Sequence, residues 1–142
     1  MLRVLFLFGV SFSLMADLRS IQAEPNLEKR SDLALAYAED VIDTARQAHK
    51  ASDEKAFAAA MKDMLDSVEL SRKSLEDTGK AARRSPKYFK RAEMKTRTII
   101  RRLDNLEKEV GFEDRAAVEQ VVKRVHEIHD QILMNIMTEK HK

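Results

Sequence analysis

Apolar residues recur at alternating spacings of three and four along the chain after residue 26, which is the period of an amphipathic α-helix. Four segments carry such a stripe, and we predict helices at 27–50, 53–78, 86–110 and 115–137. The predicted inward positions are Ala34, Ala38, Val41, Ala45 and Ala48; Phe57, Met61, Met64, Val68, Ser71 and Leu75; Phe89, Ala92, Thr96, Ile99, Leu103, Leu106 and Val110; and Val118, Val121, Val125, Ile128 and Ile132.

Residues that commonly begin or end helices separate these segments. They are Ser52 or Asp53 before the second helix, Thr78 and Gly79 after it, Ser85 and Pro86 before the third, Gly111 after it and Asp114 before the fourth. Helices of this length joined by short turns must lie antiparallel. The sequence therefore predicts an all-α protein, an antiparallel up-down-up-down four-helix bundle over residues 24–142. A long helical hairpin that completes its bundle by dimerising is the alternative, so the chain is expected to be a monomer or a homodimer.

The first residues have a different pattern. Arg3 precedes a largely apolar run from Val4 to Ala16, which is shorter than the roughly 20 residues that span a bilayer. A charged start, a short apolar run and a small residue at Ala23 are typical of a secretory signal peptide. We expect residues 1–23 to be removed and the mature chain to begin at Glu24, with cleavage after Ala16 as an alternative. An N-terminal helix buried in the core or an uncleaved membrane anchor is the other interpretation. Export predicts a periplasmic or secreted protein.

Positive charge is concentrated in one stretch. The chain has 26 lysines and arginines against 24 acids, yet residues 79–102 hold ten of the bases and one acid, Glu93. Residues 24–78 hold thirteen acids and eight bases. At 100° per residue, the bases of the third helix fall opposite Phe89 and Leu103, so we expect them to face solvent.

Such a basic surface indicates an anionic partner, either an acidic protein surface or an anionic envelope component. The candidate partner-binding residues are Lys80, Arg83, Arg84, Lys87, Lys90, Arg91, Lys95, Arg97, Arg101 and Arg102. The competing interpretation is that these bases pair with acids of the first two helices. Nucleic acid is not favoured as the partner, because Tyr88 is the one aromatic side chain expected on this surface for bases to stack on, and one such side chain is too few.

A metal or haem site is the alternative function. Met61 and Met64 fall on a predicted core face, as does His129, with His126 at its edge. Counting about 1.5 Å per residue from the shared end of the bundle places Met64 and His129 within one turn of the same level. A methionine facing a histidine can ligate haem iron or copper. The competing interpretation is that the methionines fill the core.

The sequence contains no cysteine, no serine elbow, no glycine-rich phosphate loop and no predicted pair of inward carboxylates. We therefore expect a protein that is not an enzyme.

Two stretches, "SLEDTGKAARRSPKYFKRAEMKTRTIIRRLDNLEKEV" and "VKRVHEIHDQILMNIM", resemble those of small exported helical proteins of bacteria that have no assigned function. This resemblance implies export and a helical fold, and it implies no activity or site residue. The Ala-rich first two helices also resemble small periplasmic metal-binding helical proteins that are dense in histidine, whereas this chain has four histidines. The function predicted from the sequence is that of an exported interaction protein that binds an anionic partner.

Overall fold

The computed structural model describes residues 18–138, and within them it contains helices and turns but no strand. The predicted all-α class is confirmed. A short helix at residues 18–22 precedes four long ones, which are α2 (Leu27–Lys50), α3 (Glu54–Asp77), α4 (Pro86–Glu109) and α5 (Phe112–Thr138). None of the helices in this part of the chain is both long and apolar enough to cross a membrane.

Side chains next to the helix ends explain most boundaries. Asn26 accepts a hydrogen bond from the backbone N–H of Lys29, and the carboxylate of Asp53 accepts one from Ala56. After α3, Gly79 adopts a positive φ of 64°, a conformation that costs glycine little. These contacts show why α2 and α3 begin, and why α3 ends, close to the expected residues.

Two predicted caps differ from the structure. The Ser85 side chain makes no capping bond at the start of α4 and instead donates to a carboxylate oxygen of Glu28 at 2.8 Å. The fourth helix begins at Phe112 rather than after Asp114. Its first turn is held by the Gly111 carbonyl, which accepts from the N–H groups of Asp114 and Arg115. The helix thus starts two residues before Asp114, so Asp114 lies in its first turn.

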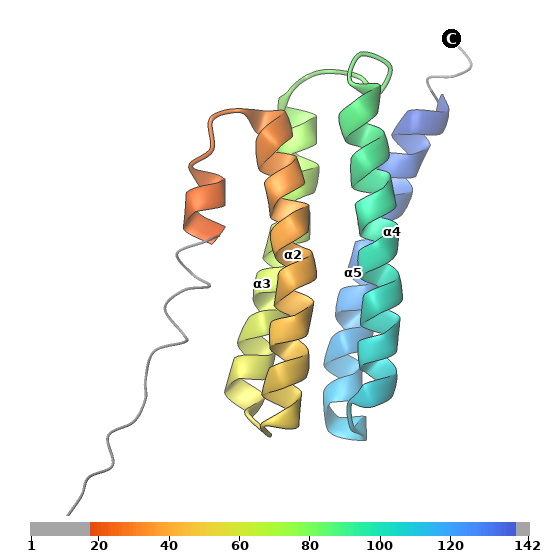
Figure 1. Ribbon diagram of the computed structural model, residues 1–142. Coiled ribbons are helices and arrows are strands. Elements are labelled where there is room, and N and C mark those ends of the chain that lie inside the picture. The colour runs from red at the N-terminus through yellow and green to blue at the C-terminus, as the bar shows by residue number, and fades with distance from the viewer. Residues whose placement is uncertain (1–17, 139–142) are drawn as a thin grey trace, which may run out of the picture.

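The four long helices lie side by side, and successive helices run in opposite directions (Figure 1). The first hairpin, α2–α3, packs against the second hairpin, α4–α5. Between the hairpins, α2 contacts α4 and α3 contacts α5, so α4 sits diagonally across from α3. One long face of α4 therefore has no helix of the described chain packed over it.

The core runs between both hairpins. Every inward position predicted from the four stripes is buried, including the polar positions Ser71 and Thr96, whereas His129, also predicted on a core face, is partly buried. The Thr96 hydroxyl is satisfied by donating to the Ala92 carbonyl at 2.8 Å. The buried face of α2 is rich in alanine, and that of α3 includes Ala60, Ser67 and Ser71, so small side chains fit the close packing within the first hairpin.

The predicted signal peptide falls largely on residues 1–17, which lie outside the described part of the chain. Just after them, Leu18 and Ile21 are partly buried against the core. The carbonyl of Glu24 accepts a hydrogen bond from the Arg30 side chain at 2.8 Å. The proposed mature N-terminus is thus adjacent to the start of α2.

A candidate anion-binding surface on α4

The basic residues of α4 and of the loop before it (residues 78–85) differ in their surroundings. Some pair with acids of α2, Arg97 pairs with Glu93 of its own helix, others lie on the outer face of α4, and two lie in the loop. The sequence predicted a single basic surface, so this division is the main structural result for the site.

The group that faces α2 is paired with acids of that helix. Lys80 lies 3.0 Å from a carboxylate oxygen of Glu28, and Arg102 lies 2.7 Å from one of Asp43. Asp32 receives two bases, Arg91 at 3.1 Å and Lys95 at 3.0 Å. These pairs give direct support to the interpretation that part of the positive charge holds the two hairpins together.

The pKa of Glu28 reports the same arrangement. Hydrogen bonds from Ser85 and then Lys80 lower the pKa of this carboxyl below its usual range. Glu28 therefore stays ionised at the position where the loop enters α4. The sequence signal for this seam was the spacing of Glu28, Asp32 and Asp43, which places all three on one side of α2.

The seam between α4 and α5 has a different character. The Nε2 atom of His129 lies 3.0 Å from a carboxylate oxygen of Glu93, and Arg97 binds the other oxygen at 2.9 Å. Burial disfavours the charged form of Glu93, but the hydrogen bonds from His129 and Arg97 outweigh this effect and lower its pKa. The one acid in the basic stretch is thus turned towards α5 and away from the outer face.

The outer face of α4 carries an open groove of about 380 Å³. Its lining contains four bases and no acid, and it consists of Lys87, Lys90, Arg91, Met94, Lys95 and Thr98. The Nζ atom of Lys87 lies over the Tyr88 ring, 5.7 Å from its centroid. Lys90 and, further along the helix, Arg101 are exposed and have no ion pair with any residue between 18 and 138. Arg91 and Lys95 share the Asp32 carboxylate at the edge of the groove, so the groove keeps an excess of positive charge that can attract anions.

The remaining candidates lie in the loop. Arg83 and Arg84 are both exposed there, at the end of the molecule where α4 begins. Sequence reasoning did not separate the bases that pair with α2 from those on the outer face, and it gave no role to Met94, which lines the groove and is 60% exposed.

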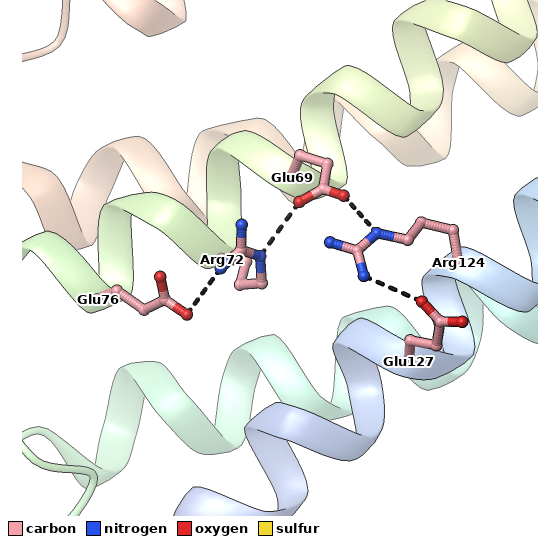
Figure 2. A network of polar contacts seen from close by, with 5 residues as sticks. All are labelled: Glu69, Arg72, Glu76, Arg124 and Glu127. Carbon is pink, nitrogen blue, oxygen red and sulfur yellow. Dashed lines mark hydrogen bonds and ion pairs between the residues drawn. The ribbon is translucent and has the colours of Figure 1, made fainter.

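A second ionic network joins α3 to α5 (Figure 2). Arg124 of α5 binds both Glu69 of α3 and Glu127 of its own helix, while Arg72 binds both Glu69 and Glu76. Here too the first hairpin supplies an acid and the second supplies a base. Most ion pairs between the hairpins therefore have the acid on the first hairpin, and the exceptions are Arg46 with Glu109 and His49 with Asp114.

The structure does not bring the residues of the predicted metal site together. Met61 and Met64 are buried in the core, whereas His126 is exposed and His129 is engaged by Glu93. The helices α3 and α5 run in the same direction, and the ion pair of Glu69 with Arg124 marks a common level along them. Met64 lies before that contact and His129 beyond it, so the two are not level, contrary to the estimate from helix length. Within residues 18–138, no three His, Cys, Asp or Glu side chains are grouped so that they could hold a metal ion.

The opposite end of the molecule has a smaller groove of about 130 Å³ beside the α2–α3 turn. His49 lines it, with Nδ1 3.7 Å from an Asp114 oxygen and its ring packed edge-on against Phe57. Ser52, also in the lining, has a positive φ of 55°. These contacts fasten the turn to the start of α5, and they give His49 a structural role that the sequence did not indicate.

Comparison with known proteins does not add to these observations, since no family model, no curated protein and no solved structure matches the chain.

Proposed function

We propose that this chain is an exported, non-catalytic interaction protein that binds an anionic partner through the outer face of α4. In this proposal residues 1–23 are a signal peptide, and residues 24–142 work as an antiparallel up-down-up-down four-helix bundle that presents the surface. The observation that carries the proposal is the α4 groove, which is lined by four bases and by no acid.

In this proposal the bases of α4 that face α2 and those on its outer face have different roles. Arg102 and Lys80 are engaged by acids on α2, so they serve mainly to dock the hairpins. Lys87 and Lys90 project from a face over which no described helix packs, so their charge is not needed for docking. Solvent-exposed charges without partners contribute little to stability, and clustered like charges reduce it. Since stability does not account for this cluster, we attribute it to a ligand.

The proposal is tested by moving the same charge change between two faces of the molecule. The variant K87E/K90E reverses two lysines of the groove. The matched control K55E/K73E reverses two exposed lysines of α3, which have no ion pair with any described residue. Both variants have the same net charge, so a difference between them reports location and not total charge.

At low ionic strength we expect a column of immobilised heparin, which is a polyanion, to retain the wild-type protein. The protein should elute as the salt concentration rises. K87E/K90E should elute at much lower salt and K55E/K73E should elute close to the wild type, with all three melting at similar temperatures. Equal losses of retention in both variants, or a large loss of thermal stability in K87E/K90E alone, would show that the groove is not a binding surface.

A further inference from the structure

We infer that the anionic partner is a phospholipid membrane surface, which the outer face of α4 contacts lengthwise with Met94 at its centre. This inference rests on the proposed function and specifies its ligand. It follows from three properties of the face: its shape, its apolar content and the way its cations are spaced.

The face is long, and its groove is open to solvent rather than enclosed. From Lys87 to Arg101 it extends for about 21 Å at 1.5 Å per residue, and Figure 1 shows α4 as an uninterrupted rod along the side of the molecule. A groove this open does not enclose a small anion, because small ligands bind in concave sites that bury most of their surface. A flat, extended anionic surface is the complementary shape.

The cations are arranged for such a surface. Lys87, Lys90 and Arg101 lie along the outer face of α4. Arg91 and Lys95 flank this face on the side of α2. Long lysine and arginine side chains can extend their charges to headgroups while their stems stay on the helix. Each one near an anionic bilayer adds a comparable increment of attraction and requires no fixed partner geometry.

Met94 supplies the apolar contact. It lies between the bases of the groove and is 60% exposed, and it is the large exposed apolar residue of α4. A flexible methionine at this position can enter the boundary between headgroups and acyl chains when the flanking charges bring the helix to the membrane. One such residue predicts reversible, salt-sensitive binding rather than stable anchoring.

Other macromolecules fit this face less well. A protein partner usually requires about 800 Å² on each side with an apolar, well-packed centre, and here the centre is one methionine among charges. Single-stranded nucleic acid needs aromatic platforms for its bases. Tyr88 is half-buried and Lys87 lies over its ring, so no such platform is available on this face.

The experiment places a fluorophore at the predicted contact. The sequence contains no tryptophan, so Met94→Trp introduces a single reporter in the groove. Ala59→Trp, at an exposed position of α3, is the control on the far side of the molecule. Each protein is mixed with vesicles of phosphatidylglycerol and phosphatidylcholine, or of phosphatidylcholine alone, and its emission and co-sedimentation are measured. All proteins share one N-terminus, so binding through the apolar residues 4–16 would be common to them and would also occur on neutral vesicles.

We expect the emission of Met94→Trp to shift to shorter wavelength with anionic vesicles and to stay unchanged with neutral ones, while that of Ala59→Trp stays unchanged with both. The charge reversals are made in the protein without tryptophan. Its partitioning onto anionic vesicles should fall by about 10-fold or more in K87E/K90E, and it should change little in K55E/K73E. Circular dichroism of Met94→Trp verifies its helix content, and co-sedimentation of the wild type gives a second readout that does not depend on this substitution.

The outcomes separate the two proposals. Heparin retention that depends on Lys87 and Lys90, without a spectral shift or co-sedimentation on anionic vesicles, overturns the membrane inference and leaves the proposed function standing. A shift of equal size with neutral vesicles also overturns it, since charge would then play no part. Absence of both heparin retention and vesicle binding contradicts the proposed function itself.

Discussion

At the scale of single residues, a row of hydroxyl groups lies inside the first hairpin. Ser31 and Ser71 are buried and hydrogen-bonded to each other at 2.7 Å. Ser74 lies one turn further along α3 and is equally buried, yet its Oγ has no hydrogen-bond partner among the described residues. Small side chains allow α2 and α3 to approach closely, and each hydroxyl brought into this seam must then be satisfied locally or remain unsatisfied.

The two serines predict opposite effects of the same substitution. Ser71→Ala leaves the buried Ser31 hydroxyl without its partner, which should cost about 1 to 3 kcal/mol. Ser74→Ala removes a hydroxyl that has no partner in the described structure, so the free energy of unfolding should stay the same or rise. Urea denaturation of the two variants checks this. Equal destabilisation of both would mean that Ser74 has a partner in solution.

Asp32 links the internal ion pairs to the binding surface, because its two partners, Arg91 and Lys95, also line the groove. Its carboxylate competes with any external anion for these bases. We expect Asp32→Asn to bind heparin about 2- to 5-fold more tightly, which corresponds to the value of an exposed or partly exposed ion pair.

The control for this change is Asp40→Asn, which alters net charge equally at an exposed position of α2 that has no ion pair with the described residues. It should leave affinity nearly unchanged when measured by the same titration. Comparable tightening in both variants would mean that Asp32 acts only through net charge.

At the scale of elements, the ends of α3 and α4 are both followed closely by a glycine, and the two glycines differ in conformation. Gly79 has a φ of +64°, whereas Gly111 does not lie in the left-handed region, and a Cβ on either would meet nothing within 4 Å. Gly79→Ala should therefore cost about 1 to 2 kcal/mol through backbone strain alone. Gly111→Ala should be neutral or stabilise by up to about 1 kcal/mol, because it restricts the unfolded chain. Thermal denaturation of both variants tests this difference, and a similar loss of stability in the two would contradict it.

The α3–α5 network predicts how stability depends on pH. Burial opposes ionisation of Glu69, but hydrogen bonds from Arg124 and Arg72 outweigh it and lower the pKa below its ordinary value near 4.5. A lowered pKa in the folded state contributes stability above the unfolded value, and that contribution is lost as pH falls through the folded value. The wild type should thus lose stability as pH is lowered below about 5.

Glu69→Gln should be less stable than the wild type at pH 7, and the difference should shrink towards pH 3. Arg72 keeps Glu76 and Arg124 keeps Glu127 in this variant, so neither arginine is left without an ion pair. Denaturation across this pH range measures the effect, with Asp40→Asn as the unpaired acidic control. A difference that is constant with pH would rule out the ionised carboxylate as its source.

The elements themselves were largely predictable, because helix formation and burial depend on periodic patterns that a sequence displays directly. The apolar stripes located the four long helices but not the short one at residues 18–22, and the stripe residues placed inward are buried. Caps were less predictable since a polar residue near a helix end has several possible partners. Ser85 bonds Glu28 from the other hairpin, and only the tertiary arrangement brings that carboxylate within reach.

At the scale of the whole molecule, the uneven charge along the sequence becomes an electrostatic contact between two hairpins. Acids of α2 and α3 meet bases of the 78–85 loop, α4 and α5 along both seams, and the bases in excess remain on the outer face of α4. The sequence showed that positive charge is concentrated at residues 79–102. It could not show which of these bases would be neutralised, because that depends on which helix lies beside α4 and at what level.

The predicted pairing of Met64 with His129 differs from the structure for a similar reason. Helix periodicity gives the direction of a side chain but not the axial offset between two helices. Here the offset is set by loops and by contacts such as that of Glu69 with Arg124. The sequence therefore gives the amount of charge in a segment. Whether residues of two helices form one site can be determined only from the structure.

The central claim is that the outer face of α4 is a binding surface and not only part of the internal ionic contacts. Residue-resolved NMR tests it most directly, by titrating the isotope-labelled protein with a short heparin oligosaccharide at low ionic strength. We predict chemical-shift changes concentrated at Lys87, Lys90, Met94 and Arg101, which are reversed by salt, with amides of α3 unaffected. Changes spread evenly over the molecule, or no changes at any residue of α4, would contradict the account.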